Sequence, residues 1–300
     1  MCESFSAGLR VWDLHAALNH LNQRRLAPAA PDAHWQADLR QTHELALLEG
    51  DFLAQSQAEV AEQAACAPTD PDAFLDWFNA LREHGPGQHD PLFDHLADHA
   101  TLDEVRWFLR QELAGEAGFE DLVALSQLRL PERAKLELAR NYWDEMGQGK
   151  PHAMHGPMLG ILARELDIQD TPLHEITWES IALGNLLVGL AYNRRYAYHA
   201  LGALGVVELT APSRAVKVVQ ALDRLGVARR VSRYFRVHAV VDVGHARTWG
   251  DEVLRPLVAE RPEVAVWLAQ GALMRLQAGA RTFERYRREL GVHAPLAQAA

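Results

Sequence analysis

Cysteine is scarce in this sequence. Cys2 and Cys66 are the only cysteines in 300 residues, and they form no CxxC pair. Zinc ribbons, iron–sulfur clusters and a disulfide framework need more cysteines, so we exclude them. No uninterrupted run of about 18 apolar residues occurs, and therefore we expect no membrane-spanning helix and no membrane partner. The opening stretch MCESFSAGLR lacks the charged and then apolar pattern of a secretory signal, which predicts a cytoplasmic protein.

Positive charge is also in short supply. The sequence has 30 Lys and Arg against 40 Asp and Glu, a formal net charge of −10. Because nucleic-acid phosphates bind to basic surfaces, we expect no nucleic-acid partner. Several catalytic motifs are missing as well: there is no HExxH, no GxSxG, no P-loop, and no ExxH of the ferritin-like diiron proteins. A metal centre in this chain must therefore use another arrangement of ligands.

Helix-forming residues are what the sequence has in abundance. Ala, Leu, Glu, Gln and Arg dominate, and no hairpin turn separates alternating apolar residues, so we expect an all-α protein. Proline and glycine divide the chain into approximate helices at 10–26, 33–66, 71–83, 91–99, 102–128, 132–147, 153–166, 177–207, 211–225, 228–259 and 263–289. Linker-like stretches at 66–72 and 83–91 indicate an N-terminal helical extension, 1–95, ahead of a metal-binding helical domain, 96–300.

Three polar residues interrupt the apolar stretch RVHAVVDVGHARTW, residues 236–249. On an α-helix, His238, Asp242 and His245 fall within an arc of about 60°, so their side chains point toward one spot. Two imidazoles and a carboxylate form a donor set that suits iron or manganese. The alternative is a pair of core histidines beside a stray aspartate.

Glu208 follows a long apolar run in ALGALGVVELTAP. Its neighbours on the same helical face are Leu201, Leu204 and Gly205. A buried carboxylate at such a position needs a compensating partner, because an unpaired buried charge is costly. A metal ion is one such partner, and Arg214 is the other candidate.

A second candidate pair lies in ARNYWDEMGQGKPHAMHGPML, residues 139–159. Glu145 shares a helical face with Leu138 and Tyr142, which predicts an inward orientation. Ten residues of straight helix would separate Glu145 from His155 by about 15 Å, so a bend at GQGKP is needed to bring them together. His152 remains an alternative to His155, and a surface glutamate near a loop histidine is the non-functional interpretation.

Two further glutamates lie in FLRQELAGEAGFEDLVAL, residues 108–125. Glu112 and Glu116 are one helical turn apart, and like charges at this spacing repel mildly unless something compensates them. The alternative is a solvated acidic face. His95 and His99 have the same spacing, but their surroundings are acidic, so we expect a polar surface there.

The candidate ligands occur in the chain order Glu145, His155, Glu208, His238, Asp242, His245. This order resembles the haem-oxygenase-like diiron oxidases and oxygenases, a superfamily of iron-containing redox enzymes. In that superfamily a Glu and a His precede a Glu on a later helix and then a His-x3-Asp-x2-His element. HAVVDVGH matches the last element fully, and EMGQGKPHAMH matches the first. QELAGEAGFEDLVAL and NYWDEMGQG also look like this family, and the resemblance spans about residues 100–260.

The resemblance implies a haem-oxygenase-like helical bundle in which the six residues bind two Fe(II) ions, with O2 as co-substrate. Some members use a further glutamate from the preceding helix, which would be Glu112 or Glu116 here. A fourth carboxylate would neutralise two ferrous ions, since the six residues include only three. We favour Glu112, because the resemblance places a glutamate there more firmly.

The expected activity is therefore that of an O2-dependent iron oxidoreductase. The substrate would be a small organic molecule of the amino-acid, amine or fatty-acid class, and a homodimer is an assembly that the sequence leaves open. Two alternatives remain: a cofactor-degrading relative on the same fold, and a non-catalytic helical interaction protein whose polar core is structural.

Overall fold

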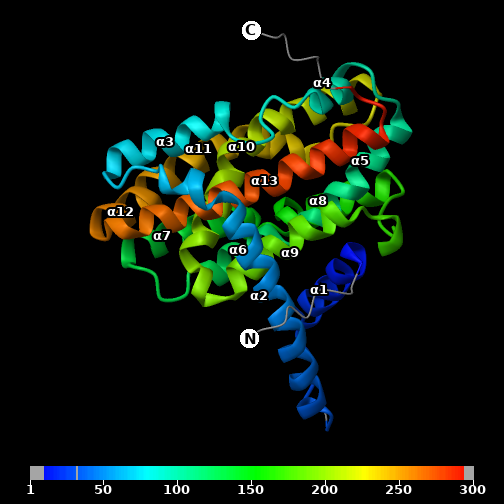
Figure 1. Cartoon of the computed structure of the whole chain (residues 1–300). Helices are drawn as coiled ribbons and strands as arrows, with labels where there is room; N and C mark the ends of the chain where they lie inside the picture. The colour runs from blue at the N-terminus through cyan, green and yellow to red at the C-terminus, as the bar shows by residue number, and fades with distance from the viewer. Residues whose placement is uncertain (1–9, 32, 294–300) are drawn as a thin grey trace.

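The computed structural model describes residues 10–31 and 33–293, and all regular structure in this part of the chain is helical (Figure 1). The all-α prediction is therefore confirmed. None of the described helices combines the length and apolar character of a membrane span. The α-helices are α1 (Val11–Leu26), α2 (Trp35–Ala65), α3 (Pro71–His84), α4 (Pro91–Asp98), α5 (Leu102–Gly115), α6 (Phe119–Ser126), α7 (Glu132–Glu145), α8 (His155–Glu165), α9 (Trp178–Tyr192), α10 (Ala197–Arg224), α11 (Arg233–Trp249), α12 (Arg255–Glu260) and α13 (Ala265–Glu289).

The helix expected over 102–128 divides into α5 and α6. Ala117 and Gly118 have φ angles of 63° and 70°, in the left-handed region where a right-handed helix cannot continue. The Glu116 carboxylate accepts hydrogen bonds from the backbone N–H groups of Gly118, at 3.0 Å, and Phe119, at 3.1 Å. These bonds satisfy amides at the start of α6 that have no partner within the helix. Glu116 therefore lies at a corner between two helices.

α10 is longer than the sequence predicts. We expected a break between residues 207 and 211, but α10 runs without interruption through Pro212. Pro212 cannot donate to the carbonyl of Glu208, which costs one helical hydrogen bond. The helix continues because α11 and α13 pack along it. The expected helix over 177–207 ends instead at Tyr192, the last residue of α9. The side chain of Asn193, which follows, accepts a hydrogen bond from the N–H of Arg195.

The helix expected over 228–259 also differs. α11 begins at Arg233, gives way to a π-helical turn over Gly250–Leu254, and is followed by α12. Pro256 lies in the first turn of α12, where its missing N–H costs least. The π-helical turn thus joins two helices that the sequence pattern does not separate.

Two hydrophobic cores hold the bundle together. The larger joins α2, α3, α6, α7, α9, α10, α11, α12 and α13, and the smaller joins α4, α5, α8, α10 and α13. Leu53 of α2 and Phe74 of α3 belong to the larger core, while the first half of α2 projects from the bundle beside α1 (Figure 1). The domain boundary at residue 95 stays a prediction.

α10 and α13 run through both cores and approach each other closely. A Cβ atom on Gly202 would overlap the backbone of Leu268, and one on Gly271 would overlap the carbonyl of His199. Two glycines on facing helices therefore allow the backbones to come into contact, and this brings the central helices closer than larger side chains permit.

Gly271→Ala should lower the melting temperature of the metal-free protein. The added methyl group meets backbone atoms that cannot rotate away, and overpacking of this kind costs about 2 kcal/mol or more. At roughly 2 °C per kcal/mol for a domain of this size, the decrease should be several degrees, measurable by circular dichroism. Gly50→Ala in α2 is the matched control, because a Cβ there meets nothing within 4 Å. An equal decrease in both variants would contradict the close-approach explanation.

Candidate metal centre

All six predicted ligands are buried, and they come from four helices. Glu145 ends α7, His155 begins α8, and Glu208 lies in the middle of α10. The remaining three lie on one face of α11, as their spacing of four and three residues predicts. The four helices therefore direct nitrogen and oxygen ligands toward a common region.

The predicted bend between Glu145 and His155 is present. Three consecutive residues, Gly147, Gln148 and Gly149, have positive φ angles of 61°, 52° and 81°. They reverse the chain through two short 3₁₀ turns, so that α8 starts beside the end of α7. As a result the Nδ1 atom of His155 lies 2.7 Å from Oε2 of Glu145.

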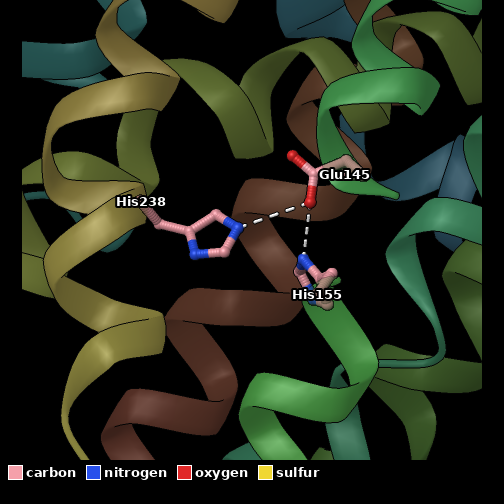
Figure 2. Close-up of side chains that lie close together, drawn as sticks. All are labelled: Glu145, His155 and His238. Atoms are coloured by element: carbon pink, nitrogen blue, oxygen red, sulfur yellow. Dashed lines mark hydrogen bonds and ion pairs between the residues drawn. The ribbon is translucent and has the colours of Figure 1, made fainter. Parts of the chain in front are cut away.

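The first cluster consists of Glu145, His155 and His238. Figure 2 shows one Glu145 oxygen, Oε2, facing both imidazoles, 2.7 Å from Nδ1 of His155 and 3.4 Å from Nε2 of His238. Nδ1 of His238 lies 2.8 Å from the carbonyl of Tyr234, to which it donates a hydrogen bond. That bond fixes the tautomer and leaves Nε2 as the ligand atom.

The second cluster consists of Glu145, Glu208 and His245. Nδ1 of His245 lies 3.5 Å from Oε2 of Glu208 and 3.7 Å from Oε1 of Glu145. Asp242 is adjacent, with Oδ1 at 3.8 Å from the same nitrogen. In each cluster the ligand atoms lie within 4.8 Å of one another, a spacing that one ion could span.

The two clusters share the carboxylate of Glu145 but use different oxygens of it. Oε2 faces the first cluster and Oε1 the second. A carboxylate with both oxygens directed at separate ligand sets is suited to bridging two ions. One side chain therefore connects two candidate metal positions.

The additional glutamate beside this centre is Glu116, whereas the sequence analysis favoured Glu112. Oε1 of Glu116 lies 2.6 Å from Nε2 of His155, and Glu120 completes a third group with them. Glu112 belongs to none of the potential ligand groups among the described residues. The helical break at residues 116–118 explains the difference, because the side chain of a residue at the end of α5 is free to turn toward α8.

The other candidate histidines lie elsewhere. His152 is exposed in the 3₁₀ turn before α8, so His155 is the histidine that meets Glu145. His95 lies 4.0 Å from Glu104, and His99 is exposed at the end of α4. Within the part of the chain that the structure describes, none of these three joins a potential metal cluster.

Sequence reasoning missed three residues that support the ligands. Asn141 donates a hydrogen bond to Oε1 of Glu208 at 2.6 Å, and Oδ2 of Asp144 lies 3.4 Å from Nε2 of His245. The backbone carbonyl of Tyr234 accepts a hydrogen bond from Nδ1 of His238. Asn141 precedes Glu145 by four residues and Tyr234 precedes His238 by four, so helical spacing from the ligands was an available signal.

A family model described as iron-containing redox enzyme matches residues 106–280. The chain belongs to this family. Two crystal structures of a CADD-like protein of unknown function from Nostoc punctiforme also match the fold. The first structure has a TM-score of 0.56 and 19% sequence identity, and the match covers 71% of this chain and 95% of that chain. The second has a TM-score of 0.52 and 17% sequence identity, and the match covers 82% of this chain and 99% of that chain. No curated protein matches the chain.

These matches confirm the predicted family and the haem-oxygenase-like all-α bundle. The family match includes all six predicted ligands, which lie between residues 145 and 245. In this iron-containing family, the two clusters around Glu145 are the residues to test as metal ligands.

In the metal-free centre, the pKa values of two buried carboxylates shift in opposite directions. Burial and repulsion from Glu208 raise the pKa of Asp242 to about 8. Burial would also raise the pKa of Glu145, but hydrogen bonds from His155 and His238 outweigh it and hold this pKa below its ordinary value. Glu145 is thus ionised at neutral pH, whereas Asp242 retains its proton.

The histidines compensate the ionised carboxylates. Burial opposes a positive charge on His155, but Glu116 and Glu145 raise its pKa well above the ordinary value. Burial also opposes a positive charge on His245, but the interaction with Glu208 is stronger and raises the pKa of His245 to about 9. Protons therefore occupy the centre in the metal-free protein, and a metal ion must displace them.

The residues of this centre fit a transition-metal ion. Oδ1 of Asp242 and Nδ1 of His245 are both buried and lack a hydrogen-bond partner within residues 10–31 and 33–293. Unpaired buried polar atoms are costly, and a cation between a carboxylate and an imidazole would satisfy both. Mixed nitrogen and oxygen ligands suit iron, in agreement with the family.

A cavity of about 150 Å³ adjoins the centre. Glu145, Glu208 and His238 lie on its wall together with apolar side chains from α5, α8, α9 and α10. A cavity of about this volume accommodates a molecule the size of benzene. A small organic molecule can therefore lie beside the candidate ligands.

Asp242→Asn should change how the stability of the metal-free protein depends on pH. Asp242 has a folded pKa of about 8 against an unfolded value of 3.8, so unfolding releases its proton and stability falls as pH rises between these values. Asparagine removes this fall. Between pH 5 and 6.5 the difference should be on the order of 2 kcal/mol, or roughly 4 °C in melting temperature.

The difference between wild type and Asp242→Asn isolates Asp242, because His15 and His199, whose pKa values burial lowers, affect both proteins alike in this window. His155, His238 and His245 have raised pKa values, so their contributions are fully present below about 6.5 and are lost only at higher pH. The control variant is Asp121→Asn, an exposed carboxylate on α6. Identical pH profiles for wild type and Asp242→Asn would mean that Asp242 is ionised in the metal-free protein.

Proposed function

We propose that this protein is a non-haem diiron oxidase or oxygenase that uses O2 to oxidise a small organic substrate. The observation that carries the proposal is the position of Glu145, whose two oxygens face two separate ligand sets. A mononuclear site needs one such set. Two sets joined by a single carboxylate are what a dinuclear centre requires.

The ligands divide between two ions. His155 and His238 would bind the first ion, and Glu208, Asp242 and His245 the second, with Glu145 between them; Glu116 lies at the other nitrogen of His155. The set contains four carboxylates, whose charge of −4 balances the +4 of two ferrous ions. We assign the fourth negative charge to Glu116 and not to Glu112, because Glu116 lies beside His155 whereas Glu112 interacts with Arg214 and Arg275.

When bound, two ferrous ions would supply the two electrons that reduce O2 to the peroxide level. The chain's own residues keep the ligands in place for this chemistry. The Tyr234 carbonyl orients His238, Asn141 orients Glu208, and Asp144 faces the outer nitrogen of His245. Outer hydrogen bonds of this kind tune both the affinity for metal and the geometry of the ligands.

The adjoining cavity gives the substrate a place outside bulk water. Its walls include Phe108, Leu183 and Leu187, which exclude solvent from the reacting atoms. The hydroxyl of Tyr234 lies 3.3 Å from Nε2 of His155 at the same wall. Burial raises the pKa of this hydroxyl, so it remains protonated and available as a hydrogen-bond donor.

Anaerobic loading with Fe(II) should give about two irons per chain in the wild type. Glu145→Gln should reduce the content to below one iron, because both ions lose the shared ligand, whereas Asp242→Ala should remove mainly the second ion. Elemental analysis after gel filtration measures the content. On mixing with O2, the wild type should consume about one O2 for every two irons.

Glu132→Gln is the control, since Glu132 is exposed at the start of the same helix, α7. It should bind iron like the wild type. Saturation of the wild type at one iron would refute the dinuclear centre, and a wild type that binds two irons but consumes no O2 would refute the oxidase activity.

A further inference from the structure

Two arginines line the same cavity as the metal centre. Arg214 comes from α10 and Arg275 from α13, and both are partly buried. Nothing in the proposed metal chemistry uses them. The cavity is therefore lined by two kinds of polar group. Carboxylates and imidazoles surround Glu145, and guanidinium groups come from Arg214 on α10 and Arg275 on α13.

Neither arginine forms a close ion pair with another described residue. No carboxylate oxygen in the described part of the chain lies within 4.0 Å of either guanidinium group, and Glu112 acts on both from further away, although burial desolvates both arginines. Arg275 makes no hydrogen bond to any described residue, and its Nε atom is buried without a partner. An arginine has five N–H donors, and leaving them unused in a buried position is costly.

The two side chains are nevertheless held in place. Arg214 donates a hydrogen bond to Oγ1 of Thr210 at 3.1 Å, and its guanidinium lies over the ring of Phe283, 5.5 Å from the centroid. Arg275 folds back over Gly279, where an added Cβ would lie only 2.6 Å from Nη1. The glycine thus leaves the space that the guanidinium occupies.

The local charge is positive. Glu112 is the acidic side chain that interacts with both arginines, and two positive charges against one negative leave a net charge of about +1. Burial raises the pKa of Glu112, which makes the region more positive still when this carboxyl is protonated. Burial lowers the pKa of Arg214 to about 9, so it stays charged at neutral pH.

The arginines are separated from the metal ligands along the cavity. Arg214 follows Glu208 by six residues on α10, which corresponds to about 9 Å along the helix axis. Ala211 lies between them on α10 and lines the cavity, and the wall also includes the apolar side chains of Leu109 and Leu162. An apolar segment can therefore extend from a group bound to the arginines toward the metal centre.

We propose that Arg214 and Arg275 bind the carboxylate of the substrate, and that the substrate is a small, mainly apolar carboxylic acid whose far end lies at the metal centre. This inference deepens the proposed function and rests on it. Arginine binds carboxylates through paired, charge-assisted hydrogen bonds, which would occupy the unused donors. A monoanion also neutralises the net charge, whereas an amine adds to it and a zwitterionic amino acid leaves it unchanged.

The test is isothermal titration of the full-length protein with hexanoate, hexan-1-ol, hexylamine and acetate. Titrations use the metal-free protein and the protein loaded with Mn(II), which keeps the metal centre filled without O2 chemistry. Hexanoate should bind in both forms and more tightly than the other three. Arg275→Met should weaken hexanoate binding by roughly 10- to 100-fold, as expected for the loss of hydrogen bonds to a charged group, and leave hexan-1-ol unaffected.

Arg281→Met is the matched control, because Arg281 lies on the same helix and pairs with Glu59 outside the cavity. It should bind hexanoate like the wild type. Gly279→Ala tests the same site without changing any charge, and should weaken hexanoate binding by displacing the Arg275 guanidinium. It decides the question if Arg275→Met does not fold.

Three results would overturn the inference: hexanoate that binds no better than hexan-1-ol, binding that Gly279→Ala and Arg275→Met leave unchanged, or binding that requires Mn(II). The last result would mean that the carboxylate binds to the metal. Failure of the proposed function is separate, since it is measured by iron content and O2 consumption, and neither enters these titrations.

Discussion

The carboxylate of Glu145 is the group on which the rest of the site depends. It is buried, and a buried carboxylate is stable only where charge or hydrogen bonds compensate it. Here the compensation comes from His155 and His238 on one side and from His245 on the other. His155 begins α8, whereas His238 and His245 both lie on α11, so the bend after α7 and the straight course of α11 serve the same carboxylate.

Part of this arrangement follows from sequence because it depends on local geometry alone. The positions of His238, Asp242 and His245 on one face are fixed by helical periodicity. His155 required a bend, which the two glycines of GQGKP made predictable. Glu116 could not be chosen over Glu112 in the same way, because both lie on one predicted helix and only the break at residues 117–118 turns one of them toward α8.

The fold was predictable to a similar extent. An all-α protein follows from composition, and most helix ends follow from proline and glycine. Pro212 was misleading because packing against α11 and α13 decides whether a helix continues through a proline, and that packing is a property of the whole chain. The arginines at the far end of the cavity were hidden for the same reason: Arg214 and Arg275 are 61 residues apart and meet only through the close approach of α10 and α13.

That close approach connects the core to the site. Gly202 and Gly271 bring α10 and α13 into backbone contact, and the same two helices then carry Glu208, Arg214 and Arg275 along the cavity. The acidic side chains lie where imidazoles and metal ions can neutralise them. Arg214 lies about one and two-thirds turns further along α10, Arg275 lines the same cavity from α13, and the described residues leave both without an ion pair. A cavity with opposite charges at separated positions orients any molecule that carries a single charged end, and this orientation decides which atom of the molecule lies at the metal centre.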